Sequence, residues 1–541
     1  MPSMTGGGAT VAALLAHGID TLYALPGVQS DHLFNAIFDA NGAMRVIHTR
    51  HEQGAAYMAL GAAIATGKPS AYCVVPGPGF LNSTAALCTA QALNAPVLAV
   101  SSQIPLGAIG KGHGVLHEIP DQMAIMRQLT KWAGRADTPA DAPGVIAQAF
   151  QAMNSGRRGP TGIELPADML KSSADVSPVA PLAIDPPPAA LGADIEKAAA
   201  LIAKAERPLI FVGGGALHAG AEVKALADLT GIQVVGHRQG RGVLDARHPL
   251  SITMAEAYPL WKDCDLVVSV GSRVSIPLTV WGTDDAMKLV RIDLDEREMA
   301  RYRKPDALII ADAKQATAAL VEQLHGKNFD TKGRIEASLR HRAEFAKKVS
   351  VLEPQLSYLR VLREVLGEDG ILLDDLTQVG YVSRIAYPVY KPRTFLNSGY
   401  MGTLGWGVAT ALGVKHAVGN TPVVVISGDG GFMYNVQELS TAVRHRIPAV
   451  FVCFNDSAFG NVRRMQKELH GNRVIGSDLL NPDFLKLADA YGLAGYRARS
   501  PEELRPVLAK ALAAGEPALI EVPIGETPSP WGFIEVPRVR G

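Results

Sequence analysis

The sequence is poor in the features that mark secreted, membrane-spanning and nucleic-acid-binding proteins. Its four cysteines, Cys73, Cys88, Cys264 and Cys453, are scattered through mostly apolar runs, which predicts buried thiols rather than a disulfide framework or a zinc site. No apolar run reaches the roughly 18 residues of a membrane helix, and the amino terminus does not resemble a signal peptide. The 52 basic and 52 acidic residues balance, so neither nucleic acid nor a membrane is expected as a partner. We therefore expect a cytoplasmic protein.

The length of 541 residues and the 48% of hydrophobic residues allow several domains with large cores. Short β-branched runs alternate with helix-length segments along most of the chain, which predicts an α/β fold of three domains, each a mainly parallel sheet flanked by helices. The predicted domains are residues 1–170, 191–330 and 351–525. A proline-rich linker (176–190) separates the first two, and a tail (526–541) follows the third.

A strand-like run at 423–427 and a second at 449–454 enclose one helix-length segment, MYNVQELSTAVRH. They place Asp429 and Asp456 after the carboxyl ends of two parallel strands, where open α/β sheets bind ligands. The glycines beside Asp429 permit a tight turn that brings backbone N–H groups close to a ligand. A carboxylate in such a turn suits a magnesium ion that carries phosphates. A GDG sequence alone is equally compatible with an ordinary turn.

The sequence GDGG, followed by ND and AFG, resembles the diphosphate motif of thiamine diphosphate enzymes in the acetolactate synthase, benzoylformate decarboxylase and benzaldehyde lyase superfamily. The resemblance implies magnesium bound by Asp429, Asp456 and the backbone carbonyl of Ala458. It also implies cofactor contacts from the rest of the motif, namely Gly428, Gly430, Gly431, Phe459 and Gly460. Asp456 stands where the family usually has asparagine. The added charge leaves the affinity and pH dependence of magnesium binding open.

Residues 48–84 resemble the family's pyrimidine-binding segment, with Glu52 at the key position and Pro76 in a PGPG turn. A carboxylic acid at the pyrimidine N1′ makes the 4′-amino group a base for the thiazolium C2 proton. A lone glutamate at the start of a helix more often stabilises the helix through its dipole than takes part in catalysis. The combination with the distant GDG motif favours the catalytic role.

Two further segments resemble parts of the family's cofactor site. In residues 398–413, Gly402 would supply a carbonyl to the 4′-amino group and Leu404 would lie between the two cofactor rings. In residues 374–380, Gln378 would contact the diphosphate. Acetolactate synthase also binds FAD in its middle domain, but here only Arg273 matches its arginine-rich segment and GGGALHAG does not fit GxGxxG. FAD is therefore an alternative that we do not favour.

The loop 110–134 contains two candidate catalytic histidines. Aligned on TKWA, His117 falls where related enzymes carry a catalytic glutamine, and His113 lies four residues earlier. Either could transfer protons near neutral pH, and either could equally be bonded to backbone. In the tail, Trp531 and Phe533 could cover the substrate pocket, as tails do in this superfamily, or lie on the surface.

The resemblance implies a thiamine diphosphate- and Mg²⁺-dependent enzyme that makes or breaks a C–C bond next to a carbonyl of a small-molecule substrate. We expect a 2-oxo acid decarboxylase or carboligase. An acyloin lyase or 1,2-diketone hydrolase is the enzymatic alternative, and a catalytically silent regulatory subunit is an alternative of another class. In the family the cofactor lies between two subunits, so we expect a homodimer at least, and a homotetramer as a pair of dimers.

Overall fold

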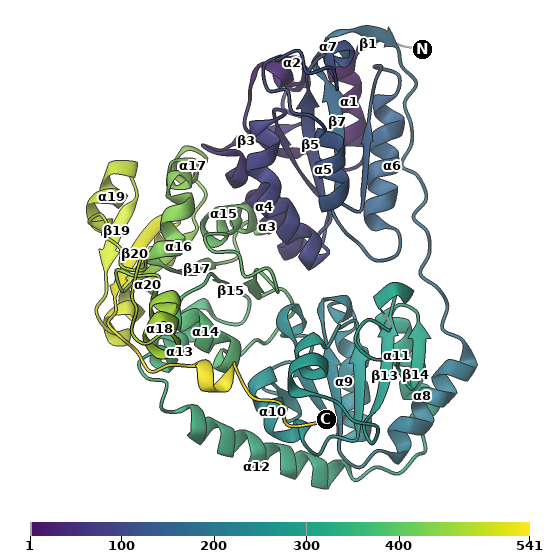
Figure 1. Cartoon of the computed structure of the whole chain (residues 1–541), viewed down its shortest axis with the longest axis vertical. Coiled ribbons are helices and arrows are strands. Elements are labelled where there is room, and N and C mark those ends of the chain that lie inside the picture. Colours follow the sequence, from purple (N-terminus) through teal and green to yellow (C-terminus); the bar gives the residue numbers. More distant parts are fainter. Residues whose placement is uncertain (1–2, 299) are drawn as a thin grey trace.

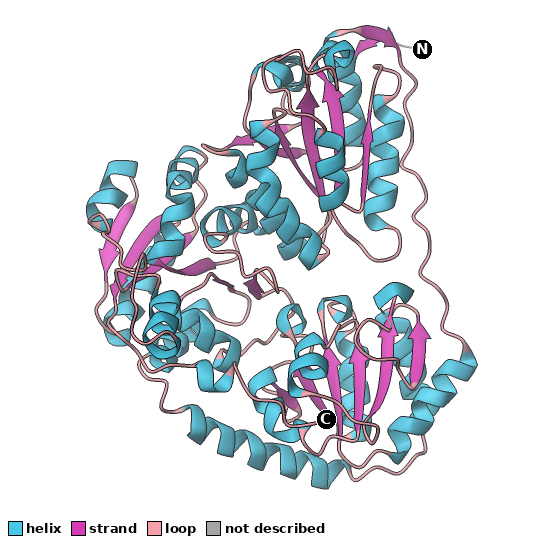
Figure 2. Cartoon of the chain, in the orientation of Figure 1, coloured by secondary structure: helices cyan, strands magenta, loops and turns pink. Residues whose placement is uncertain are grey.

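The computed structural model describes residues 3–298 and 300–541. It contains three α/β units, each built on a six-stranded parallel sheet (Figures 1 and 2). This confirms the predicted fold class. In Figure 1 the amino-terminal unit lies at the top, the middle unit at the lower right and the carboxyl-terminal unit at the left. In the described part of the chain, no helix is long and apolar enough to cross a membrane.

The amino-terminal sheet has the strand order β3-β2-β4-β5-β7-β6. Its strands are β2 (Thr21–Ala24), β3 (Arg45–His48), β4 (Ser70–Val74), β5 (Val97–Gln103), β6 (Trp132–Arg135) and β7 (Thr161–Pro166). Its helices are α1 (Gly6–Ala16), α2 (Asp31–Asp39), α3 (Glu52–Thr66), α4 (Pro78–Leu93), α5 (Gln122–Leu129), α6 (Ala142–Asn154) and α7 (Ala167–Lys171). A short antiparallel pair, β1 (Ser3–Thr5) with β8 (Ser173–Asp175), closes this unit.

The middle sheet has the order β11-β10-β9-β12-β13-β14. Its strands are β9 (Pro208–Val212), β10 (Gln233–Gly236), β11 (Ser251–Ile252), β12 (Leu266–Val270), β13 (Lys288–Asp293) and β14 (Ala307–Ile310). Its helices are α8 (Gly192–Lys204), α9 (Gly220–Thr230), α10 (Met254–Trp261) and α11 (Ala313–Leu324), and α12 (Thr331–Val349) leads out of the unit. Strands such as β9 and β12 read as near-continuous apolar runs because helices cover both faces of a parallel sheet.

The carboxyl-terminal sheet has the order β16-β15-β17-β18-β20-β19. Its strands are β15 (Ile371–Asp374), β16 (Phe395–Asn397), β17 (Val423–Gly428), β18 (Val450–Asn455), β19 (Ala494–Arg497) and β20 (Ala518–Pro523). Its helices are α13 (Gln355–Leu366), α14 (Gln378–Ala386), α15 (Gly407–Val418), α16 (Asp429–Phe432), α17 (Leu439–Arg444), α18 (Gly460–Leu469), α19 (Phe484–Tyr491) and α20 (Pro501–Ala514).

One hydrophobic cluster spans the first and third units, each of which also has a cluster of its own, and two further clusters lie in the middle unit. Helix α3 is apolar on all sides and is almost entirely buried, as expected for a helix that is covered all round. It packs so closely on α15 that a Cβ at Gly413 would collide with the carbonyl of Met58, and one at Gly61 with the carbonyl of Thr410. The backbones of two domains therefore meet directly at these glycines.

The predicted helix between the two aspartate-bearing strands is broken in the structure. Helix α16 runs into a 3-10 segment, Met433–Glu438, before α17 begins. Asn435 within this segment has non-helical torsions (φ −127°, ψ 25°), and its Nδ2 donates to the Gly405 carbonyl at 2.7 Å. The expected helix-length segment is therefore helical in parts and interrupted at Asn435, whose side chain is held by a carbonyl distant in sequence.

Candidate active site

A cavity of about 260 Å³ lies at the carboxyl ends of β17 and β18. All of its lining residues belong to the carboxyl-terminal unit, and they include most of the predicted cofactor and metal residues. They are Leu376, Thr377, Gln378, Tyr381, Leu404, Gly428, Asp429, Gly430, Gly431, Phe454, Asp456, Ala458, Phe459, Gly460, Asn461, Val462 and Ile524. The sequence motifs that lie far apart along the chain therefore meet in one place.

The parallel pairing of β17 and β18 brings Asp429 and Asp456 together. Gly428 stands opposite Phe454 in the register, so each aspartate follows at the same edge of the sheet, as predicted. Asp429 is fully buried, and its Oδ2 accepts from Asn481 Nδ2 at 2.6 Å. Its Oδ1 has no hydrogen-bond partner within residues 3–298 and 300–541. A buried carboxylate oxygen without a donor is costly unless it binds a cation.

Asp456 lies beside Asp429 in the same cavity. Burial, reinforced by the neighbouring Asp429 carboxylate, raises the pKa of Asp456 to about 7. A proton near neutral pH thus relieves the repulsion between the two carboxylates, and a divalent cation would do the same by displacing that proton. The residues therefore fit a hard cation bound by Asp429, Asp456 and the carbonyl of Ala458.

The described residues contain no group of three or more His, Cys, Asp or Glu that could hold a metal by itself. Magnesium does not require such a group, since it commonly completes its octahedral shell with phosphate oxygens and water.

The glycines of the motif keep the cavity open. A Cβ at Gly430 would lie 2.6 Å from Phe459 Cε1, and one at Gly460 would lie 2.5 Å from Asp456 Oδ2. Helices α14 and α18 both begin at cavity-lining residues, Gln378 and Gly460. Because the first N–H groups of a helix lack intrahelical partners, these two helix starts suit the anionic oxygens of a diphosphate.

The loop 398–405 supplies the side of the cavity above the glycines. Leu404 Cδ1 would lie 3.2 Å from a Cβ at Gly431, so the leucine lies directly over the glycine turn. Gly402 adopts a positive φ of +57°, which glycine tolerates best. Leu404 lines the cavity, and Gly402 lies in the same loop; the predicted contacts of both residues with the cofactor stay predictions.

Glu52 begins helix α3 in the amino-terminal unit, where His51 caps the helix by accepting from Gln53 N at 3.1 Å. The Glu52 side chain is 14% exposed, and its Oε2 accepts from Asn82 Nδ2 at 3.0 Å. Pro76 lies in the turn before α4, and Gly79, at the start of that helix, is close to the Glu52 carboxylate. Glu52 thus has a fixed orientation and belongs to a different unit from the residues that line the cavity.

The structure also specifies the orientation of His117. Gln29 donates its Nε2 to the carbonyl of Leu116 at 2.9 Å, so its Oε1 must face His117 Nδ1, which lies 3.0 Å away. Since this oxygen only accepts, His117 carries a proton on Nδ1, and in the neutral ring Nε2 is the basic atom. His117 has a positive φ of +69°, a strained conformation for a residue other than glycine. His113, in contrast, is an exposed loop residue.

Several residues of these sites were missed in the sequence. They include Asn481, which bonds Asp429, and Asn82, which bonds Glu52. Asp375 is buried beneath the glycine turn and accepts from Ser427 Oγ at 2.9 Å, with its pKa raised to about 6 mainly by burial. Glu438 accepts from Arg50 N at 3.1 Å and so supports the segment before Glu52. Asn82, Asp375 and Glu438 lie inside segments that stand out in the sequence, but their roles depend on contacts that only the fold brings about; Asn481 lies outside any such segment.

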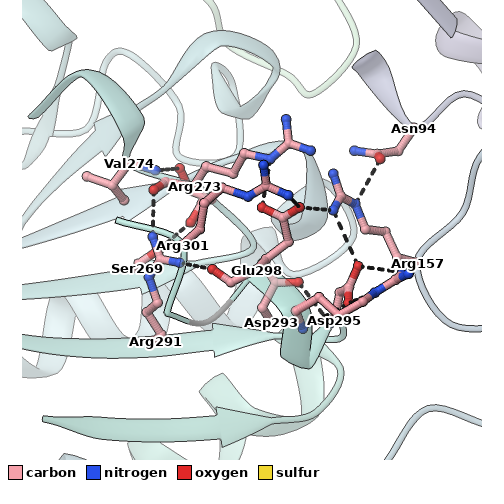
Figure 3. Close-up of polar contacts among 12 residues, drawn as sticks. Asn94, Arg157, Ser269, Arg273, Val274, Arg291, Asp293, Asp295, Glu298 and Arg301 are labelled. Carbon is pink, nitrogen blue, oxygen red and sulfur yellow. Dashed lines mark hydrogen bonds and ion pairs between the residues drawn. The ribbon is translucent and has the colours of Figure 1, made fainter. Parts of the chain in front are cut away.

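The middle unit offers little to a dinucleotide at its sheet edge. A Cβ at Gly215 would lie 2.8 Å from Gly271 Cα, so the turns after β9 and β12 pack against each other. Arg273 is already paired with Glu298 at 3.0 Å, and Arg157 of the amino-terminal unit contacts the same carboxylate (Figure 3). Arg273, the one arginine that matches the FAD-binding segment, is thus committed to a carboxylate that also holds Arg157, and these residues do not fit an FAD-binding role.

The tail runs from the carboxyl-terminal unit to the middle unit (Figure 1). The Trp531 ring lies 4.7 Å from that of Tyr381, which lines the cavity, and Arg464 lies 4.9 Å from Trp531. Phe533 packs on Phe345 of α12. The tail therefore backs one wall of the cavity at Tyr381.

Comparison with known proteins agrees with this geometry. Residues 4–125, 195–320 and 375–522 match, in turn, the N-terminal TPP binding domain, the central domain and the C-terminal TPP binding domain of thiamine pyrophosphate enzymes. The class is therefore that of enzymes with two thiamine diphosphate-binding domains around a central one.

The relatives narrow the class. The chain is 32% identical to a probable acetolactate synthase large subunit of Methanocaldococcus jannaschii, over 96% of this chain and 92% of that protein. It is 31% identical to a probable 2-ketoarginine decarboxylase of Pseudomonas aeruginosa, over 96% and 94%, and 29% identical to acetolactate synthase isozyme 3 of Escherichia coli, over 95% and 93%. The chain belongs to the thiamine diphosphate-dependent enzyme family that contains acetolactate synthase, which confirms the resemblance seen in the sequence.

Proposed function

We propose that the protein is a thiamine diphosphate- and Mg²⁺-dependent enzyme that decarboxylates a 2-oxo acid, with or without joining the product to a second carbonyl compound. The observation that carries the proposal is the cavity in which Asp429, beside Asp456, presents a buried oxygen with no hydrogen-bond partner among the described residues. The names of two relatives, an acetolactate synthase and a 2-ketoarginine decarboxylase, support this choice of reaction.

In this proposal the carboxyl-terminal unit anchors the cofactor. Asp429, Asp456 and the Ala458 carbonyl would hold Mg²⁺, while Gly430, Gly431 and the starts of α14 and α18 would bind the diphosphate. When bound, thiamine diphosphate would supply a nucleophilic carbon and an acceptor for the electron pair of the C–C bond. Leu404 would hold the cofactor's rings in place.

In this proposal, residues of the amino-terminal unit carry out the proton transfers. Glu52 would share a proton with the pyrimidine N1′, with its carboxyl group held by Asn82. His117 Nε2 would accept or return a proton at the substrate, since Gln29 keeps the other ring nitrogen protonated. We assign no proton transfer to His113.

We further propose that two copies of the chain form the complete site. The cavity is lined only by residues of the carboxyl-terminal unit, so Glu52 of a second subunit is the natural complement. A homodimer is thus the minimum, and a homotetramer is our expectation. A cytoplasmic location is also proposed, in line with four free cysteines.

An acyloin lyase or 1,2-diketone hydrolase would use the same residues and needs no substrate carboxylate, so it is the alternative reaction. A silent regulatory subunit would have no chemical need for the bonded Glu52–Asn82 pair and the Asp429 oxygen together. These features favour an active enzyme.

The test is a parallel assay of the apoprotein reconstituted with thiamine diphosphate and Mg²⁺. Pyruvate, other aliphatic 2-oxo acids, 2-keto-arginine and benzoylformate are compared with benzoin, acetoin and a cyclic 1,2-diketone. Carbon dioxide released from one or more 2-oxo acids supports the proposal. Cleavage of the acyloins or the diketone without any decarboxylation would instead support an acyloin lyase or 1,2-diketone hydrolase. The absence of turnover with a wide panel of substrates would argue against catalysis.

A further inference from the structure

The segment 477–481 lies behind the proposed metal site rather than inside the cofactor cavity. It pairs antiparallel with the segment 457–459 through a bridge between Ala458 and Asp478. Two backbone hydrogen bonds of 2.8 Å flank this bridge and involve the neighbours of Ala458, not its carbonyl. The pairing carries Asn481 to the buried side of the cavity wall, where it bonds a proposed metal ligand without being a lining residue itself.

Charges at both ends of a hydrogen-bonded chain fix the orientation of two amides, Asn455 and Asn481. At one end, Glu521 accepts from Arg497 Nε at 2.7 Å and from Asn455 Nδ2 at 2.8 Å. Asn455 Oδ1 therefore faces Asn481 Nδ2, at 3.0 Å. The same Nδ2 donates to Asp429 Oδ2 at 2.6 Å. Because an ionised carboxylate only accepts, flipping either amide would place oxygen against oxygen.

The bond from Asn481 engages one oxygen of the Asp429 carboxylate and leaves the other for a cation. Asp429 Oδ1 is buried and has no hydrogen-bond partner among the described residues. A hydrogen bond to a charged acceptor is short and roughly twice as strong as one between neutral groups. A cation that bound both oxygens of Asp429 would have to break it. The structure thus offers a cation only one oxygen of this carboxylate.

Divalent cations differ in how they use carboxylates. Mg²⁺ prefers octahedral coordination by single oxygens at roughly 2.0–2.1 Å, whereas Ca²⁺ takes about six to eight oxygens and often binds both oxygens of one carboxylate. We propose that Asn481 is a positioning residue that sets the cation preference of the site, because its hold on Asp429 Oδ2 favours Mg²⁺ over Ca²⁺. This inference rests on the proposed function, since it concerns the cation of that same site.

A merely structural role for Asn481 predicts a different pattern. Its loss would loosen the segment 477–481, and both cations would then bind more weakly by the same factor. The ratio of the Kd values for Mg²⁺ and Ca²⁺, taken within one protein, cancels such a common loss. The ratio therefore reports how many oxygens of Asp429 a cation can use.

The test is calorimetric titration of Mg²⁺ or Ca²⁺ into the full-length apoprotein with thiamine diphosphate in excess. The parent is compared with Asn481→Leu, which keeps a similar volume without a donor, and with Asn481→Ser, whose short side chain does not reach Asp429. In both variants the Kd ratio should move toward Ca²⁺ by about tenfold, because both oxygens of Asp429 become available. The readout is binding, so it does not depend on turnover.

Controls separate this inference from the proposed function. Asn420→Ser, at an exposed asparagine, should keep the Kd ratio of the parent. A ratio that is unchanged or moves toward Mg²⁺ in the Asn481 variants, with a parent that binds the cofactor in Mg²⁺, would overturn this inference alone. A parent that binds thiamine diphosphate with neither cation would overturn the proposed function as well. If Asn481→Leu does not fold, Asn481→Ser decides the question by the same ratio.

Discussion

The first and third units have the same strand order and opposite chemistry. When β3 is matched with β16, β2 with β15 and β4 with β17, the orders β3-β2-β4-β5-β7-β6 and β16-β15-β17-β18-β20-β19 coincide along the whole sheet. One unit nevertheless presents Glu52 and His117, and the other presents Asp429 and Asp456. The fold fixes where the loops lie, and the loop residues decide what is bound there.

The turns after the matched strands β4 and β17 make the difference concrete. The first reads Pro76-Gly77-Pro78-Gly79 and the second Gly428-Asp429-Gly430-Gly431. Each proline removes an N–H donor, so the first turn loses two groups that could hold a phosphate. The second turn keeps all its donors and adds a carboxylate for a cation. The matched turns therefore differ in the number of N–H donors and in charge, although the strand order around them is the same.

The largest effect should come from Glu52→Gln. The amide retains the shape and an oxygen for Asn82 but cannot share a proton, so C2 proton exchange and turnover should fall by about 10²–10⁴-fold with little change in cofactor affinity. The rate of C2 proton exchange is measured by quenched deuterium exchange followed by NMR. Glu206→Gln, at a carboxylate that is 79% exposed, should leave exchange unchanged. Full C2 proton exchange in the Glu52→Gln variant would refute the proton-sharing role assigned to Glu52.

Asp429→Asn tests the other half of the comparison. Loss of one anionic metal ligand should weaken thiamine diphosphate binding in Mg²⁺ on the order of 100-fold. Chelation of Mg²⁺ should release the cofactor from the parent protein. Calorimetric titration gives both values. Asp478→Asn, nearby but 73% exposed and paired with Arg463, is the control; equal losses in both variants would point to a nonspecific charge effect.

Asp456→Asn sharpens the question of why this chain has a carboxylate there. Because the pKa of Asp456 is raised to about 7, the parent must lose a proton to bind Mg²⁺ below that pH. Its cofactor affinity should therefore fall by up to about tenfold per pH unit from pH 7 to 6, and level off above pH 8. The variant should show a flat profile over this range. Parallel pH profiles for the two proteins would mean that Asp456 does not compete for the metal.

Gln29→Leu should have the smallest effect, because it alters only the orientation of His117. Without the acceptor at Nδ1, both neutral tautomers become available, and kcat should fall by about 3–10-fold with a displaced pH profile. Gln151→Leu, at a residue bonded to the linker carbonyl of Ala183, is the matched control. An unchanged pH profile would show that His117 needs no such partner or plays no part.

The sequence predicted the three parallel sheets well because their central strands are contiguous apolar runs with a glycine, proline or polar boundary, whereas edge strands such as β6 and β19 lack such a run. It also predicted that Asp429 and Asp456 meet, since both follow adjacent parallel strands. It could not predict Asn481 or Gln29, which reach their partners across long stretches of chain. Nor could it predict the break at Asn435, where a side chain bonds a distant loop. Local pattern encodes strands and turns, and long-range packing decides these partners.

The direct contact of α3 with α15 sets a boundary for protein engineering. Gly61 and Gly413 each face a carbonyl of the opposite helix, so even a methyl group at either position would push the two helices apart. Helix α3 begins at Glu52, and α15 begins shortly after Leu404. Loops around the cavity can be randomised in a search for new substrates. A useful library would keep these two glycines fixed, since they set the spacing on which every loop variant depends.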